Sequence, residues 1–92
     1  MTHVITHEAL QRLLDMDQEQ LEAEAWHLDR EARLSYERLK KYPKDDLTIG
    51  QTRGRDAEIQ CLGALTAQSI TADMLLLKRF GVDTGRPIHA TE

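Results

Sequence analysis

The chain lacks most of the features that hold a small domain together covalently or as a β-sheet. Its 92 residues include one cysteine, two prolines and four aromatic side chains. One cysteine cannot form a disulfide bond within the chain, which excludes a disulfide-stapled fold. With 40% hydrophobic and 30% charged residues, the composition is more typical of a helical protein than of a β-sandwich or a disordered tail. We therefore expect one all-α domain that spans residues 1–92.

Long apolar runs and chemical motifs are missing too. No stretch of about 18 apolar residues and no charged-then-apolar leader is present, so we expect no membrane contact, no secretion signal and a cytoplasmic protein. His3 and His7 are four residues apart, but no further ligand completes a metal shell. Cys61 lies in an apolar segment, where a thiol usually acts as a small buried side chain. With no catalytic or nucleotide-binding motif, we expect no enzymatic activity, cofactor, metal or small-molecule substrate.

Capping signals predict two helices in the first half of the chain. Thr6 is a candidate N-cap for the first helix. Asp17 and Gln20 have the spacing of a capping box that starts a second helix, which predicts a break between the two. One unbroken helix over residues 7–41 is the alternative that the sequence leaves open. The predicted boundaries are about 6–15 and about 18–42.

The second half is predicted to hold a loop and one long helix. Pro43 ends the preceding helix because the residue before a proline is pushed out of the α region. The segment that follows contains glycines and aspartates typical of a loop. Gly81 is well placed as a left-handed residue that ends the last helix, with Val82 as its apolar partner in a Schellman motif. The predicted boundaries are loop 43–53, helix about 54–80 and tail 81–92, so the chain should form an antiparallel helical hairpin with a short N-terminal helix.

Both long helices carry more apolar surface than one small core can bury. In the helix over 18–42, a stripe through Leu21, Ala25 and Leu28 is predicted to face the core. The helix over 54–80 is apolar nearly all round. Its broad face, predicted to be the main one, consists of Ile59, Leu62, Gly63, Thr66, Ile70, Met74, Leu77 and Phe80. Because soluble monomers rarely expose large apolar patches, we expect a second copy or another protein to complete this small bundle.

The candidate interface consists of the apolar and aromatic residues that fall off the predicted core faces. Trp26 is the aromatic among them, and three interpretations of it stay open. It contacts another protein molecule, or packs within the chain on the aliphatic stems of Arg30 and Arg33 or under the first helix, or contacts a ligand. The candidate interface residues are Ala23, Trp26, Arg30, Leu34, Leu65, Leu75 and Leu76.

Charge is distributed unevenly along the chain. Residues 1–29 carry seven acids and one base, whereas residues 30–55 carry eight bases and four acids. In an antiparallel hairpin, the basic part falls at the end where the long helices are joined. Such a cluster can hold phosphates or an acidic protein surface, including that of a second copy, or simply stabilise a helix C-terminus. The candidate contacts for an anion or nucleic acid are Arg38, Lys40, Lys41, Lys44, Arg53 and Arg55.

These patterns support two hypotheses of different class. The first is a non-enzymatic interaction protein, an adaptor, assembly factor or inhibitor, that forms a homodimer or higher oligomer or docks on another protein through its apolar helix faces. The second is a small nucleic-acid-binding regulator that uses the basic tip. The net charge of −4 weighs against the second hypothesis, so the first is the one the sequence favours.

Overall fold

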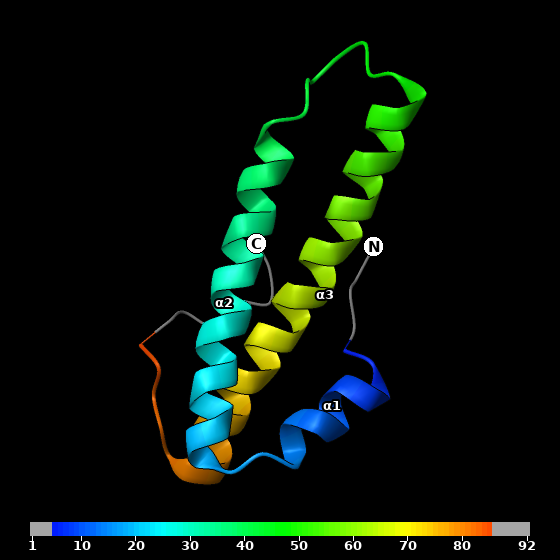
Figure 1. The fold of residues 1–92 in the computed structure, drawn as a ribbon. Coiled ribbons are helices and arrows are strands. Elements are labelled where there is room, and N and C mark those ends of the chain that lie inside the picture. The colour runs from blue at the N-terminus through cyan, green and yellow to red at the C-terminus, as the bar shows by residue number, and fades with distance from the viewer. Residues whose placement is uncertain (1–4, 86–92) are drawn as a thin grey trace.

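The computed structural model describes residues 5–85, which form three helices and no strand (Figure 1). They are α1 (His7–Leu14), α2 (Gln18–Lys40) and α3 (Ile49–Phe80). The long helices α2 and α3 pack side by side as an antiparallel hairpin. Figure 1 shows α1 against α3 at the end far from the loop that joins α2 and α3. The predicted all-α fold, a helical hairpin with a short N-terminal helix, is confirmed.

The break between the first two helices is confirmed, so the alternative of one unbroken helix is wrong. The Asp17 carboxylate accepts from the backbone N–H of Gln20 at 2.8 Å, and the Gln20 side chain accepts from the backbone N–H of Asp17 at 3.0 Å. This capping box satisfies N–H groups that the start of a helix leaves without partners. Thr6 likewise caps α1, because its hydroxyl accepts from the N–H of Ala9 at 3.1 Å.

The loop is shorter than predicted, because α3 begins at Ile49 rather than near residue 54. A capping box starts it there: the Thr48 hydroxyl accepts from the N–H of Gln51 at 3.0 Å, and the Gln51 side chain accepts from the N–H of Thr48 at 2.9 Å. The glycines that indicated a loop therefore lie inside the helix. A Cβ atom on Gly54 would stand 2.7 Å from the Tyr42 hydroxyl oxygen, so glycine lets the tyrosine ring lie against α3.

The predicted end of the last helix is confirmed at Gly81. Its φ of 69° is left-handed, a conformation that glycine adopts without steric cost. The N–H of Gly81 donates to the carbonyl of Leu77 and that of Val82 donates to the carbonyl of Leu76, both at 3.0 Å. Residues 86–92 of the predicted tail lie outside the described residues.

The core lies where the three helices meet. Leu21, Ala25 and Leu28 are buried as predicted for α2. The buried hydrophobic residues of all three helices are Leu13, Leu21, Ala25, Leu28, Ala72 and Leu76.

The prediction of the main face of α3 was wrong. The helix buries Ser69, Ala72 and Leu76, whereas Met74 and Leu77 of the broad apolar face are 38% and 48% exposed. Leu76 is thus a core residue and cannot be an interface residue. The two other α3 residues of the candidate interface, Leu65 and Leu75, are half-buried and pack against the core.

The position of α1 explains which side of α3 is covered. The Arg12 side chain forms an ion pair with Glu24 of α2 at 2.8 Å and donates a hydrogen bond to Gln68 of α3 at 3.3 Å. At the other end of α1, the Arg79 guanidinium donates to the carbonyl of Leu14 at 2.9 Å. Both faces of α3 have helical spacing, so periodicity alone could not identify the face that α1 and α2 cover.

Candidate functional site

One largely apolar row on α3 contains four exposed and two half-buried residues, and we call it the α3 stripe. Its members recur every three or four residues: Ile59, Gly63, Thr66, Ile70, Met74 and Leu77. At 100° per residue they fall within a sector of about 80°. Gln68, which contacts α1, lies about 160° from the centre of that sector. The α3 stripe therefore lies on the side of the hairpin turned away from α1.

Trp26 lies on the corresponding side of α2. By the same count it is about 160° from Glu24, the α2 residue that contacts α1. Its side chain is 58% exposed, so the interpretation that α1 covers it is wrong. The Arg30 guanidinium lies 5.6 Å from the centre of the indole ring, and Arg33 forms an ion pair with Asp29 at 3.1 Å. These four side chains line an open depression of about 370 Å³.

The remaining candidate interface residues lie elsewhere on α2. Leu34 is 42% exposed and Ala23 is also exposed. At 100° per residue, Leu34 lies about 80° and Ala23 about 60° around the helix from Trp26, towards the α1 side. The predicted interface residues therefore do not form one surface. Trp26 and Arg30 share a side with the α3 stripe, which the sequence had assigned to the core.

At the tip of the hairpin, Glu58 joins the two long helices. Arg38 donates from Nε and Nη2 to the two carboxylate oxygens of Glu58, each at 3.1 Å. Ser35, which is completely buried, donates its hydroxyl hydrogen bond to the same carboxylate. These bonds, that from Arg38 above all, lower the pKa of Glu58, and the bond with Glu58 raises the pKa of Arg38. The group acts as a clasp that keeps a charged carboxylate between α2 and α3.

The clasp changes the interpretation of the basic tip. Of the six cations predicted to bind an anion, Arg38 is held by Glu58, and Lys40 forms an ion pair with Glu37 at 3.5 Å. The others are Lys41, Lys44 and Arg53, which are exposed, and Arg55, which is half-buried. The loop itself adds two exposed acids, Asp45 and Asp46.

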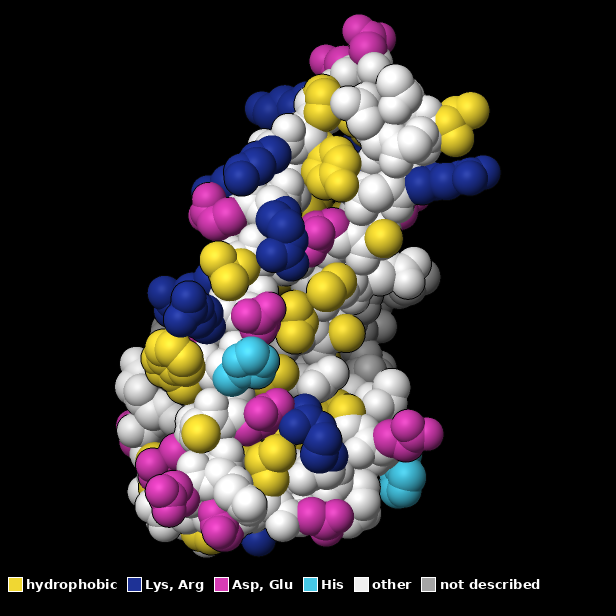
Figure 2. Space-filling model, viewed as in Figure 1, with side chains coloured by type: hydrophobic (Ala, Val, Ile, Leu, Met, Phe, Trp, Pro, Cys, Tyr) yellow, Lys and Arg dark blue, Asp and Glu magenta, His cyan; other side chains and the backbone are white. Residues whose placement is uncertain are grey.

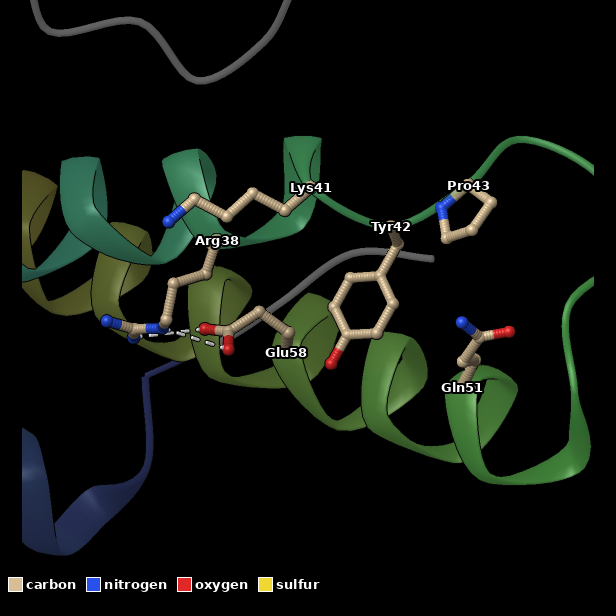
Figure 3. A pocket seen from close by; sticks show the side chains of 6 residues that line it. All are labelled: Arg38, Lys41, Tyr42, Pro43, Gln51 and Glu58. Atoms are coloured by element: carbon tan, nitrogen blue, oxygen red, sulfur yellow. Dashed lines mark hydrogen bonds and ion pairs between the residues drawn. The ribbon is translucent and has the colours of Figure 1, made fainter.

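A cavity of about 320 Å³ opens beside the clasp. Figure 3 shows Arg38 reaching from α2 to Glu58, and the Tyr42 ring lying against α3 between Glu58 and Gln51. Gln51 is already used in the cap of α3, and Arg38 and Glu58 are used in the clasp. The geometry of this cavity therefore indicates a structural joint between the helices.

Neither a metal-binding cluster nor a membrane-spanning helix is found among the described residues. Within residues 5–85, no three His, Cys, Asp or Glu side chains lie close enough together to hold a metal ion. His3 lies outside this range. No helix in the same range has the length and apolar character needed to cross a bilayer. Cys61 is exposed, so its predicted burial is wrong: α1 contacts α3 near Gln68 and Arg79 and leaves this part of the helix uncovered.

No protein-family model matches the chain, and comparisons with curated proteins and with solved structures find no similar protein.

Proposed function

We propose that this protein is a non-enzymatic interaction module that binds a protein partner through apolar side chains exposed on its two long helices. The observation that carries the proposal is the exposure of large apolar residues on an otherwise well-capped fold. Their exposed fractions are Trp26 58%, Leu34 42%, Tyr36 51%, Ile59 40%, Met74 38% and Leu77 48%.

The energetics favour a partner. Burying a large apolar side chain stabilises a protein by about 1.5–3 kcal/mol, and the chain forgoes much of this at each exposed position. Single exposed apolar residues are common, but a row of them along one helix side is typical of binding surfaces. Trp26 adds an aromatic side chain with an arginine beside it, a combination that is enriched where proteins bind one another.

Nucleic-acid binding at the basic tip is the weaker alternative. Arg38 and Lys40 are neutralised by neighbouring carboxylates, and two acids of the loop share the tip. Fewer free cations mean fewer phosphate contacts, and phosphate contacts supply most of the affinity of such binding.

Site-specific photo-crosslinking tests the proposed function. A photoreactive residue is placed at Trp26, at Leu77 or, as a matched control, at Gln60, which is exposed on α3 outside the stripe. In an extract of the producing cells, we expect discrete adducts from Trp26 and Leu77 and none from Gln60. Equal labelling at all three positions, or none at any, would contradict the proposal. The adduct mass separates a second 10.5 kDa copy from a different protein.

A further inference from the structure

The side of the hairpin turned away from α1 carries an apolar row on α3 and, on α2, charged side chains that change from negative to positive towards the hairpin tip. On α3 the row is the α3 stripe. On α2, Glu22 lies nearest the end of the molecule that holds α1, followed by Trp26, and Arg33 lies nearer the hairpin tip. At 100° per residue, these three side chains fall within about 40° of one another.

The same polarity runs through the whole molecule. Figure 2 shows that Asp and Glu side chains gather at the end that holds α1, while most Lys and Arg side chains line the long helices towards the loop. The view is that of Figure 1, so it shows the polarity on the face with α1. On the side turned away from α1, the same order is carried on α2 by Glu22 and then by Arg33. One end of the hairpin is therefore acidic and the other basic over most of its length.

This polarity selects one way of pairing two copies. When two hairpins meet face to face and antiparallel, α2 lies over α2 and α3 over α3, with the acidic end of each over the basic end of the other. Parallel copies, related by a two-fold axis along the hairpin, would instead place α2 over α3 of the second copy with the two acidic ends together, and like charges in such positions repel. The antiparallel pair is also closed by a two-fold axis, the commonest symmetry of homo-oligomers.

The register follows from the α3 stripe. Setting Ile59 against Leu77 of the second copy places the two-fold axis between Thr66 and Ile70. Gly63 and Thr66, the small members of the stripe, then lie near the centre, where they let the two α3 helices approach closely.

The same register aligns the side chains of α2. The contact between Ser35 and Glu58 shows which residues of α2 and α3 are level with one another along the hairpin. Position 68, the middle of the stripe, is then level with Ala25 of α2. With the axis there, the Trp26 side chains of the two copies lie close to the axis, and Arg30 and Arg33 are level with Gln20 and Asp17 at the acidic start of α2 in the second copy.

We infer that the α3 stripe and Trp26 are covered by a second copy of this chain, packed antiparallel on the side of the hairpin turned away from α1. The inference depends on the proposed function and names its partner. In this dimer the exposed apolar side chains are buried against one another, and the acidic end of each copy contacts the basic end of the other. Trp26 becomes an aromatic anchor close to Trp26 of the second copy.

The first test is the mass in solution, measured by light scattering over a wide concentration range. We expect the full chain to approach twice 10.5 kDa as concentration rises. Leu77→Glu should raise the dissociation constant of the dimer at least about tenfold, because it places a carboxylate in the apolar contact. Gln60→Glu, which places the same carboxylate on the exposed surface of α3 outside the stripe, should leave the constant unchanged. Circular dichroism verifies that both variants keep their helices.

The second test is the orientation of the two copies, measured by disulfide formation in a Cys61→Ser background. Thr66→Cys lies close to the axis and should link to itself. Leu77→Cys should not, because the two copies of this residue lie about 27 Å apart along antiparallel helices at 1.5 Å per residue. A mixture of Ile59→Cys and Leu77→Cys should link efficiently.

Three results would overturn the inference: a monomer at every concentration, a dimer that Leu77→Glu leaves intact, or self-linking of Leu77→Cys, which the antiparallel register excludes. A monomer whose Trp26 and Leu77 positions still photo-crosslink to a larger protein would overturn the second copy as the occupant and leave the proposed function standing.

Discussion

Replacing Leu76 with alanine is expected to lower the free energy of unfolding by about 2–5 kcal/mol. The Leu76 side chain is completely buried among α1, α2 and α3, so its removal loses apolar contacts and leaves a cavity. For a small domain with a free energy of unfolding of about 5–15 kcal/mol, this is a large part of the total. Urea unfolding followed by circular dichroism measures the change.

The neighbouring residue provides the matched control. Leu77→Ala makes the same chemical change one position along the helix, but Leu77 is 48% exposed and lies in the α3 stripe. At a concentration where the protein is monomeric, we expect a loss below about 1 kcal/mol. If Leu77→Ala were the more damaging variant, the broad face of α3 would be the core face after all, and the assignment of the α3 stripe would be wrong.

Replacing Leu13 with alanine should have the second-largest effect, a loss of about 2–3 kcal/mol. Leu13 is the one fully buried residue of α1, which is only eight residues long and holds its place through this side chain and two arginine contacts. Its truncation should loosen α1, so hydrogen exchange should accelerate in residues 7–14 before it does in α2 and α3.

Leu14→Ala is the control for this variant. Leu14 is 37% exposed, and its carbonyl, which accepts from Arg79, is unchanged by the substitution. We expect a loss below about 1 kcal/mol and no selective change in exchange over α1. Equal effects of the two variants would show that Leu13 does not anchor α1.

Features encoded by neighbouring residues were predicted correctly from the sequence. Thr6, Asp17 and Gly81 act on backbone groups within a few residues, so their spacing is sufficient to locate helix ends. The start of α3 was missed because the glycines at positions 50 and 54 indicated a loop, although Thr48 and Gln51 have the spacing of a capping box. Once a helix is well capped and packed, two glycines in its first turns are tolerated.

Features that depend on distant residues could not be predicted. The choice between the two faces of α3 is made by α1, which contacts residues more than fifty positions away through Arg12 and Arg79. The clasp at the tip also depends on residues that are distant in the sequence. Arg38 was predicted as a candidate anion contact from its position on its own helix, but its carboxylate partner comes from α3. The sequence signal that could have indicated this contact is Ser35, a polar residue in register with Leu21 and Leu28 on the face of α2 that meets α3.

For the candidate interface, too, the position of a residue on its own helix was predicted correctly, but the choice between the two faces of α3 was not. Trp26 was correctly expected to lie off the core, since its position follows from the period of one helix. Its companions were assigned to the wrong side of α3, so Leu76 replaced Leu77 in the candidate interface. A helix with two apolar faces has more apolar surface than one core can bury. The packing of the neighbouring helices decides which of the two faces stays exposed for a partner.

The central claim is that α3 turns one apolar face inward and leaves the α3 stripe open. Hydroxyl-radical footprinting of the wild-type chain, read by mass spectrometry at a concentration low enough for a monomer, tests it most directly. We expect Leu77 to be oxidised several-fold faster than Leu76, and Met74 faster than the half-buried Met16. Oxidation of Leu76 as fast as Leu77, with Met74 protected, would contradict it.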